Sequence, residues 1–180
     1  MRELADERRV AQLMLQLGPQ AEQDTRIYFA GGATAVLYGW RATTRDVDVK
    51  IVPDADRVLR AIAALKEELH MNIELAAPDD FIPVSEQWQE RSPFIKQVGR
   101  TFFYHFDLDA QALAKIERGH HQDTEDVRAM LERGLVSRQS IQDYFNQIEP
   151  RIYRYPALDL PSFRAAVASA VRGPDPRLER

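Results

Sequence analysis

The chain of 180 residues contains no cysteine. Disulfide bonds and thiolate metal sites are therefore excluded, and a reducing cytoplasm is the compartment that this composition favours. The formal net charge of −4 at pH 7 argues against a general nucleic-acid coat, because such binding depends on neutralising phosphates with lysine and arginine. A local basic surface is still compatible with this charge.

Long apolar runs are also missing from the sequence. No run approaches the roughly 20 residues that a membrane-spanning helix needs, and the first nine residues lack the apolar core of a signal peptide. We therefore expect a cytoplasmic protein without a membrane partner. Hydrophobic residues make up 44% of the chain, which is enough for one core.

The most informative segment, residues 31–48, reads GGATAVLYGWRATTRDVD. A short β-prone run precedes it, and apolar residues alternate with polar ones at its end, which predicts strand, helix and strand in order. Because strand side chains repeat every two residues, Asp46 and Asp48 are expected on one face of the second strand and Val47 on the other. The segment thus joins a glycine pair to two carboxylates.

This combination predicts a phosphate and metal site. Two carboxylates ~4 Å apart repel each other by roughly 4 kcal/mol at an effective dielectric of ~20, and a divalent cation removes that cost. Oxygen ligands favour Mg²⁺ or Mn²⁺, which take further ligands from water and substrate phosphates. Gly31 and Gly32 would let backbone amides approach a phosphate at the start of the helix.

Each motif has a simpler interpretation when it is taken alone. Paired aspartates on an alternating strand are typical of a solvated face, and a glycine pair is typical of a turn. A dinucleotide-binding turn also competes for the glycines, but the GxGxxG pattern is absent here and an acidic pair 14 residues after Gly32 comes too early for a ribose ligand. The joint spacing therefore favours the phosphate and metal interpretation.

Two blocks of the sequence resemble a known family. The pattern Gly31-Gly32, six residues, Gly39, six residues and Asp46-Val47-Asp48 resembles the signature of the DNA polymerase β-type nucleotidyltransferase superfamily. Residues 107–119, followed by Asp123 and Asp126, are similar to the D-x-x-x-L-x-x-x-K-x-x-R-G…D-x-x-D-V motif of its small prokaryotic AbiEii-like and DUF6036-type branch, several members of which are toxins of toxin–antitoxin pairs. The resemblance covers roughly residues 27–171.

The resemblance implies a metal-dependent transfer that uses Mg²⁺ or Mn²⁺ and an NTP substrate. Asp46, Asp48 and Glu74 would hold the metal, and Lys115 and Asp126 would also be catalytic, Asp126 either directly or by orienting the lysine. The nucleotide-binding residues would be Gly31, Gly32, Thr44, Arg45, Lys115 and Arg118. Many superfamily members have Gly-Ser where this chain has Gly31-Gly32-Ala33, so backbone amides or Lys115 would have to replace the serine contact.

Several of these residues have a second interpretation. Glu74 lies on a short alternating strand, residues 72–75, where an exposed strand residue is equally consistent, and Asp107 is a further candidate for the third metal carboxylate. Lys115 and Arg118 belong to a helix that Asp109 is expected to cap and Gly119 to end, where a solvated face is the usual place for helix charges. Asp123 is expected to cap the next helix, with Asp126 at its third position.

The expected fold class is α/β (α+β), a nucleotidyltransferase fold with a short mixed sheet flanked by helices. We expect a single domain over residues 1–172, with a catalytic core at 1–107 and a helical portion at 108–172 that closes over the nucleotide. A flexible tail follows at 173–180. Helices are expected at about 2–17, 138–148 and 161–172.

The expected reaction is transfer of NMP from an NTP to an acceptor hydroxyl on an RNA, a tRNA, a protein or a small molecule. A role as the toxin of a toxin–antitoxin pair, with a cognate antitoxin as partner, is part of this hypothesis. Residues 151–155 interleave arginine with tyrosine, as an RNA-stacking surface would, although such a loop can also pack on the protein body. The alternative is a catalytically silent module that binds a nucleotide or a partner protein.

Overall fold

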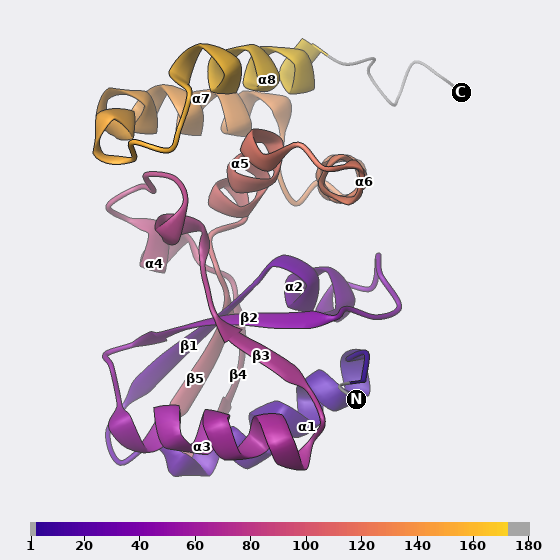
Figure 1. Ribbon diagram of the computed structural model, residues 1–180, viewed down its shortest axis with the longest axis vertical. Coiled ribbons are helices and arrows are strands. Elements are labelled where there is room, and N and C mark those ends of the chain that lie inside the picture. The colour runs from indigo at the N-terminus through magenta and orange to yellow at the C-terminus, as the bar shows by residue number, and fades with distance from the viewer. Residues whose placement is uncertain (1–2, 173–180) are drawn as a thin grey trace. The chain divides into compact units, whose positions relative to one another are not determined.

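The computed structural model describes residues 3–172 of the chain. Arg2, the expected start of the first helix, and the expected flexible tail at 173–180 lie outside the described residues. Contacts divide the chain into unit 1, Met1–Ala77 with Ser92–Phe106, and unit 2, Pro78–Arg91 with Asp107–Arg180 (Figure 1). The expectation of a single domain stays a prediction.

Unit 1 is built on a five-stranded mixed sheet with the strand order β3-β2-β1-β5-β4. β1 pairs antiparallel with β2 and parallel with β5, β2 pairs parallel with β3, and β4 pairs antiparallel with β5. The strands are β1 (Thr25–Ala30), β2 (Asp46–Val52), β3 (Asn72–Leu75), β4 (Phe94–Val98) and β5 (Thr101–His105). This mixed sheet with flanking helices confirms the expected fold class.

Two helices of unit 1, α1 (Glu7–Leu17) and α3 (Asp56–Glu68), lie on the same face of the sheet (Figure 1). A 3₁₀ turn, Gly18–Gln20, follows α1. The helix α2 (Gly31–Leu37) begins directly after β1 and lies between β1 and β2 in the chain. The expected start of α1 at residue 2 is wrong, because the side chain of Asp6 accepts the backbone N–H of Arg9 at 2.9 Å and caps the helix there. Ala5 instead pairs with Thr44, before β2, in an isolated antiparallel bridge.

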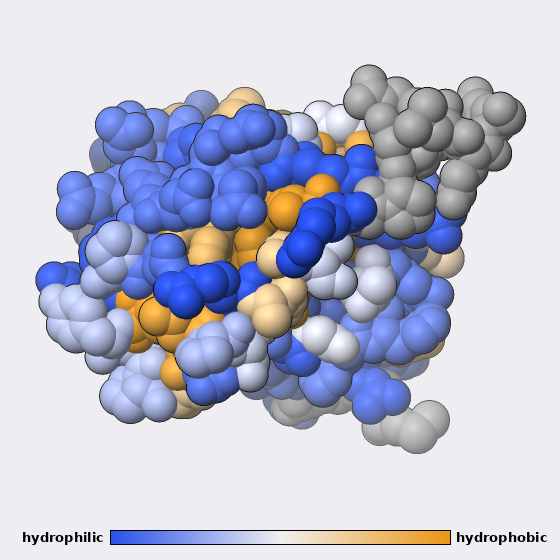
Figure 2. Space-filling view, turned by 90° about the horizontal axis from the view of Figure 1, so that it is seen from above, coloured by the Kyte–Doolittle hydropathy of each residue, from blue (hydrophilic) through white to orange (hydrophobic). Residues whose placement is uncertain are grey.

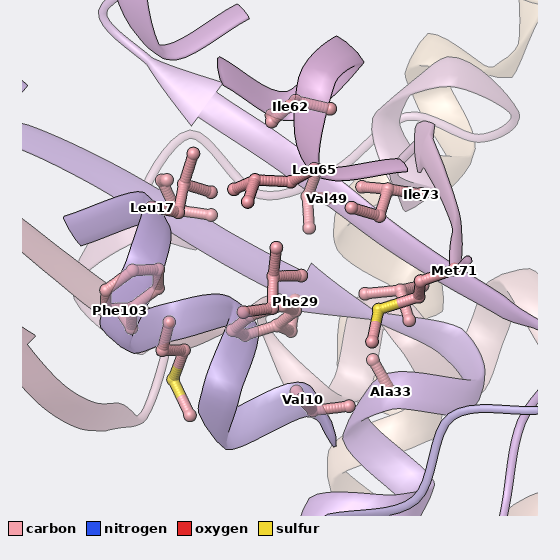
Figure 3. Close-up of a cluster of buried hydrophobic side chains, with 14 of the residues drawn as sticks. Val10, Leu17, Phe29, Ala33, Val49, Ile62, Leu65, Met71, Ile73 and Phe103 are labelled. Atoms are coloured by element: carbon pink, nitrogen blue, oxygen red, sulfur yellow. The ribbon is translucent and has the colours of Figure 1, made fainter. Parts of the chain in front are cut away.

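The core of unit 1 lies between α1, α3 and this sheet face (Figure 3). β2 buries alternate residues, and Val49 points into the same cluster as Phe29 of β1 and Leu65 of α3. Phe29 and Phe103 stack with ring centroids 5.9 Å apart. Because burying one such side chain contributes about 1.5–3 kcal/mol, this cluster fixes the register of β2 and leaves Asp46 and Asp48 on the opposite face.

Unit 2 is helical, and α5 packs against each of the longer helices that follow it. Phe145 and Phe163 meet edge to face, with ring centroids 5.0 Å apart, where α7 and α8 lie side by side (Figure 1). Its elements are α4 (Trp88–Arg91), α5 (Leu108–Arg118), α6 (His121–Glu132), α7 (Arg138–Ile148), α8 (Leu160–Arg172) and the 3₁₀ turns Pro78–Asp80 and Glu149–Arg154. The helix expected at 138–148 is confirmed, and α8 begins one residue earlier than expected.

The surface seen from above shows apolar side chains in a strip bordered by hydrophilic ones (Figure 2). Among the described residues of unit 2, the most exposed large apolar side chains are those of Phe81 and Tyr153. Within residues 3–172, none of the helices combines the length and the apolar character that crossing a bilayer requires.

Candidate active site

Three acidic side chains of unit 1, those of Asp46, Asp48 and Glu74, belong to the face of the sheet opposite the core. Asp46 and Asp48 are half-buried and alternate with the buried Val47 and Val49, as the sequence predicts. β2 and β3 are parallel, and their register pairs Asp48 with Glu74. Since paired strands lie about 4.8 Å apart, Glu74 is the neighbour of Asp48 on the same face.

Asn72 connects two of these carboxylates. Its amide nitrogen Nδ2 donates to Oδ1 of Asp46 at 2.7 Å and to Oε1 of Glu74 at 2.7 Å. The amide group is neutral, so it orients the two carboxylates without cancelling their charge. Asn72 is not among the site residues predicted from the sequence, although its i, i+2 spacing from Glu74 on one strand indicated a shared face.

The glycine pair lies directly against β2 and the segment before it. Gly31 adopts a left-handed φ of +58°, and a Cβ placed there would lie 2.6 Å from Oδ2 of Asp48. A Cβ on Gly32 would lie 1.9 Å from Oγ1 of Thr44. Gly31 therefore requires glycine for its backbone conformation, and Gly32 requires it for space beside Thr44.

The donor set of this sheet face consists of carboxylate oxygens, the ligands that hard divalent cations prefer. Within residues 3–172, histidine, cysteine and acidic side chains form no group of three or more placed to hold an ion. Asp46 and Asp48 supply oxygen atoms from one half-exposed face, which fits an ion such as Mg²⁺ that keeps several waters. Glu74 as a third ligand stays a prediction.

Thr44 and Arg45 differ in their surroundings. Thr44 is buried, and its hydroxyl donates to the main-chain oxygen of Asp46 at 3.0 Å. Arg45 is exposed. Nucleotide contacts of both residues stay predictions.

Asp107, the other candidate for the third carboxylate, is engaged inside unit 2. Its Oδ2 accepts a hydrogen bond from Nε of Arg91 at 2.8 Å. Its Oδ1 accepts a hydrogen bond from the backbone N–H of Asp109 at 3.2 Å. Asp107 is thus the N-cap of α5, and the expectation that Asp109 caps this helix is wrong, because Asp109 instead accepts Nη2 of Arg91 at 2.6 Å. Burial raises the pKa of Asp107, and the charge of Arg91 opposes this effect.

Lys115 is buried in an ion pair between α5 and α6. Its Nζ donates to Oδ2 of Asp126 at 2.6 Å and lies 3.7 Å from Oδ1 of Asp123. Lys115 is 5% exposed and Asp126 is fully buried. Gly119, with φ +67°, ends α5 as expected. This geometry shows that Asp126 contacts Lys115, whereas an orienting role for Asp126 and catalytic roles for the two residues stay predictions.

Asp123 and Arg118 form a neighbouring pair. Arg118 donates Nε to Oδ2 of Asp123 at 2.7 Å, and a second bond joins Nη2 to Oδ1. Burial alone would raise the pKa of Asp123, but the hydrogen bonds and charge of Arg118 outweigh it and lower this pKa. His120 is the N-cap of α6, so the expectation that Asp123 occupies the cap is wrong.

The two aspartates of α6 therefore lie at later positions of the helix than the sequence predicts. Asp123 sits at the third position and accepts the backbone N–H of His120 at 3.3 Å. Asp126 lies one turn further on, where it contacts Lys115 instead of completing a capping box. The cap lies at a histidine, a weak capping residue, so the local sequence signal favoured the wrong position.

The basic and aromatic segment at 151–155 is part of a 3₁₀ turn in unit 2. Tyr153 is 75% exposed, and the guanidinium carbon of Arg154 lies 5.7 Å from the centre of its ring. Tyr155 instead donates its hydroxyl to the main-chain oxygen of Asp79 at 2.8 Å. One tyrosine thus packs on the protein body and one faces solvent, and RNA contact stays a prediction.

A family model described as a nucleotidyltransferase of unknown function, DUF6036, matches residues 8–154. The match spans the glycine turn, the acidic strand and the Lys115–Asp126 pair. The chain therefore belongs to the nucleotidyltransferase class, and within it to the DUF6036 family. No curated protein and no solved structure matches the chain.

Proposed function

We propose that the protein transfers NMP from an NTP to an acceptor hydroxyl in a metal-dependent reaction. The observation that carries this proposal is the acidic face of the sheet, where Asp46 and Asp48 lie beside Glu74 and against the Gly31 turn. The family match supports the class of reaction. NTP binding follows from the same proposal.

Asp46 and Asp48 would hold Mg²⁺ or Mn²⁺, with Glu74 as the third carboxylate. When bound, such an ion polarises phosphoryl oxygens and lowers the pKa of the attacking hydroxyl. Asn72 would keep the carboxylates of Asp46 and Glu74 oriented through its two hydrogen bonds. The backbone amides of Gly31 and Gly32 would bind the phosphates, as the family motif implies, although the space beside the Gly32 Cα is itself filled by Thr44.

The roles proposed for Lys115, Arg118 and Asp126 rest on the motif that they share with the family. Positive charge on Lys115 and Arg118 would stabilise negative charge on phosphates. The 2.6 Å bond from Lys115 to Asp126 supports an orienting role for the aspartate. The acceptor classes that we propose are an RNA or tRNA, a protein, or a small molecule, and a toxin paired with an antitoxin is the proposed biological context.

The experiment is transfer of label from each α-³²P-labelled NTP, with Mg²⁺ or Mn²⁺, to total RNA and to protein. The wild type is compared with the Asp46→Asn/Asp48→Asn double variant, which keeps the shape of both side chains but removes their charge. An Asp54→Asn variant, altered at an exposed aspartate after β2, is the matched control. Label that appears with wild type and control but not with the double variant supports the proposal and identifies the acceptor class.

The second candidate function is a catalytically silent module that binds a nucleotide or a partner protein. Two observations favour it: three-acid groups placed for a metal are absent from residues 3–172, and Lys115 is occupied by Asp126. A folded preparation that transfers no label to RNA or protein, yet binds an NTP by calorimetry, would support this alternative. Toxicity on expression that a neighbouring gene product relieves would instead support the toxin hypothesis.

A further inference from the structure

The side chain of Thr44 occupies the space that Gly32 leaves open. A Cβ on Gly32 would lie 1.9 Å from Oγ1 and 2.7 Å from Cβ of Thr44, far inside contact distance. The missing side chain at Gly32 is therefore filled by the protein itself. Thr44 is 7% exposed, so this packing is closed to solvent.

The hydroxyl of Thr44 also contacts the acidic strand. It donates to the main-chain oxygen of Asp46, the first residue of β2, at 3.0 Å. This bond uses the only proton of the hydroxyl, so the group is not available as a donor to a phosphate. Thr44 thus joins the glycine turn to the start of the strand that carries Asp46 and Asp48.

The N-terminal segment before α1 holds Thr44 in turn. The backbone of Thr44 donates to the oxygen of Ala5 at 2.8 Å and accepts the N–H of Ala5 at 2.8 Å, in an isolated antiparallel bridge. Ala5 is fully buried, and the next residue, Asp6, caps α1. The backbone N–H of Glu3 donates to the main-chain oxygen of His70 at 2.8 Å. This bond fixes the other end of the segment beside the start of β3.

We propose that Thr44 is a positioning residue for the acidic face and that residues 3–6 act as a strap that holds it in place. The strap fixes Thr44, and Thr44 fixes the distance between the Gly32 turn and Asp46. The consequence for metal binding rests on the proposed function. The packing claim, that Thr44 fills the space beside Gly32, does not.

The packing claim is tested by a double-mutant cycle that needs no metal. Gly32→Ala should lower the melting temperature in a chain that keeps Thr44, and should lower it much less in a Thr44→Gly background. The matched control is Gly32→Ala in a Thr43→Gly background, because Thr43 is exposed and should give no relief. An equal loss of melting temperature in all three backgrounds would overturn the packing claim.

The functional claim is tested by Mn²⁺ affinity, measured by electron paramagnetic resonance of the free ion. Thr44→Val, which loses the hydroxyl, and Ala5→Pro, which loses the N–H donated to Thr44, should each weaken the affinity about tenfold, as loss of an outer supporting contact does. Thr44→Ser and the neighbouring Thr43→Val should stay within about twofold of wild type on the same scale.

The outcomes of this second measurement separate the two proposals. Wild-type affinity in both Thr44→Val and Ala5→Pro overturns the positioning role. A wild type that takes up no Mn²⁺ contradicts the proposed function instead, and the double-mutant cycle then decides the packing claim alone. Should Thr44→Val not fold, Ala5→Pro and Thr44→Ser, both of which keep the Thr44 hydroxyl, still distinguish a lost strap contact from a lost fold.

Discussion

The two units treat their acidic residues differently. In unit 1, the carboxylates of the sheet face are half-buried or exposed, and within residues 3–172 neither Asp46 nor Glu74 forms an ion pair. In unit 2, Asp107, Asp123 and Asp126 are buried, and each lies within hydrogen-bonding distance of a cation. Carboxylates of one chain thus lie in two different electrostatic environments.

The difference follows from the cost of burying charge. A buried carboxylate is tolerated only with a paired cation and hydrogen bonds, so the acids of unit 2 are part of its structure. A carboxylate at a half-exposed face keeps its hydration and can exchange water for an ion. The comparison predicts that substitutions in unit 2 change stability, whereas substitutions on the sheet face of unit 1 change metal binding.

The largest effect is expected from Lys115→Met, which leaves Asp126 buried without its cation. Breaking such a pair costs about 3–5 kcal/mol of the free energy of unfolding, and urea denaturation measures it. Lys115→Met/Asp126→Leu should recover much of this loss, because both charges are then gone. Lys66→Met, at a half-exposed lysine of α3, is the control, and an equal effect there would break the comparison.

The next largest effect is expected from His105, a titratable residue that is buried in unit 1 beside neutral side chains. His105 is 6% exposed, with Nδ1 3.1 Å from the Thr34 hydroxyl and its ring stacked on Tyr38. Burial lowers the pKa of His105 from 6.5 to about 4. Between these values the unfolded chain binds a proton that the folded chain does not, so stability falls as pH falls.

The loss expected for His105 between pH 6.5 and pH 4 is about 3 kcal/mol, from 1.36 kcal/mol per pH unit. Urea denaturation across this range, in wild type and in His105→Gln, isolates the contribution of this imidazole. His121→Gln serves as the control because the side chain of His121 is 89% exposed. A pH slope that is the same in wild type and His105→Gln would contradict the assignment.

A smaller effect is expected from Arg91→Ala. The guanidinium bonds Asp107 and Asp109 at 2.8 and 2.6 Å, and Asp107 is almost fully buried. Removing it should cost about 2 kcal/mol in chemical denaturation, since a buried charged acceptor loses its donor. Arg100→Ala breaks an exposed pair with Asp24 and should cost less than about 1 kcal/mol; similar losses for both would remove the distinction between buried and exposed pairs.

The smallest effect on stability is expected from Asp46→Asn. The substitution keeps an oxygen for Nδ2 of Asn72 and removes repulsion with Asp48, so the free energy of unfolding should change by less than about 1 kcal/mol. Mn²⁺ binding should be lost in the same variant. A folded Asp46→Asn protein with wild-type Mn²⁺ affinity would show that the sheet face is structural after all.

Much of unit 1 could be predicted from local patterns. Alternation in residues 46–51 predicted which face Asp46 and Asp48 occupy, because the two-residue period of a strand is local. β4 was missed, since it is an edge strand with irregular pairing near Phe94 and its residues do not alternate clearly between buried and exposed. The signal that could have found it is Gly99-Arg100, a two-residue hairpin loop between β-prone runs.

The helix ends of unit 2 were less predictable. Gly119 was identified correctly because a left-handed C-terminal residue favours glycine strongly. The caps at Asp107 and His120 were assigned to other residues, since Asp107, Asp109 and Asp123 are all good capping residues and the choice depends on their partners. Asp109 is bonded by Arg91 of α4, and Asp123 is bonded by Arg118 of the preceding helix, contacts that exist only in the folded structure.

The sequence by itself determined the class of protein, the order of strand, helix and strand around the glycine pair, and the shared face of Asp46 and Asp48. The class rests on motifs that resemble a known family, and the other two features depend on local residue spacing, which the chain encodes directly. The tertiary structure alone decided that Asn72 links Asp46 to Glu74, that Thr44 fills the space over Gly32, and that Asp126 holds Lys115. Such contacts join separate elements, and the packing of the core decides which of them meet.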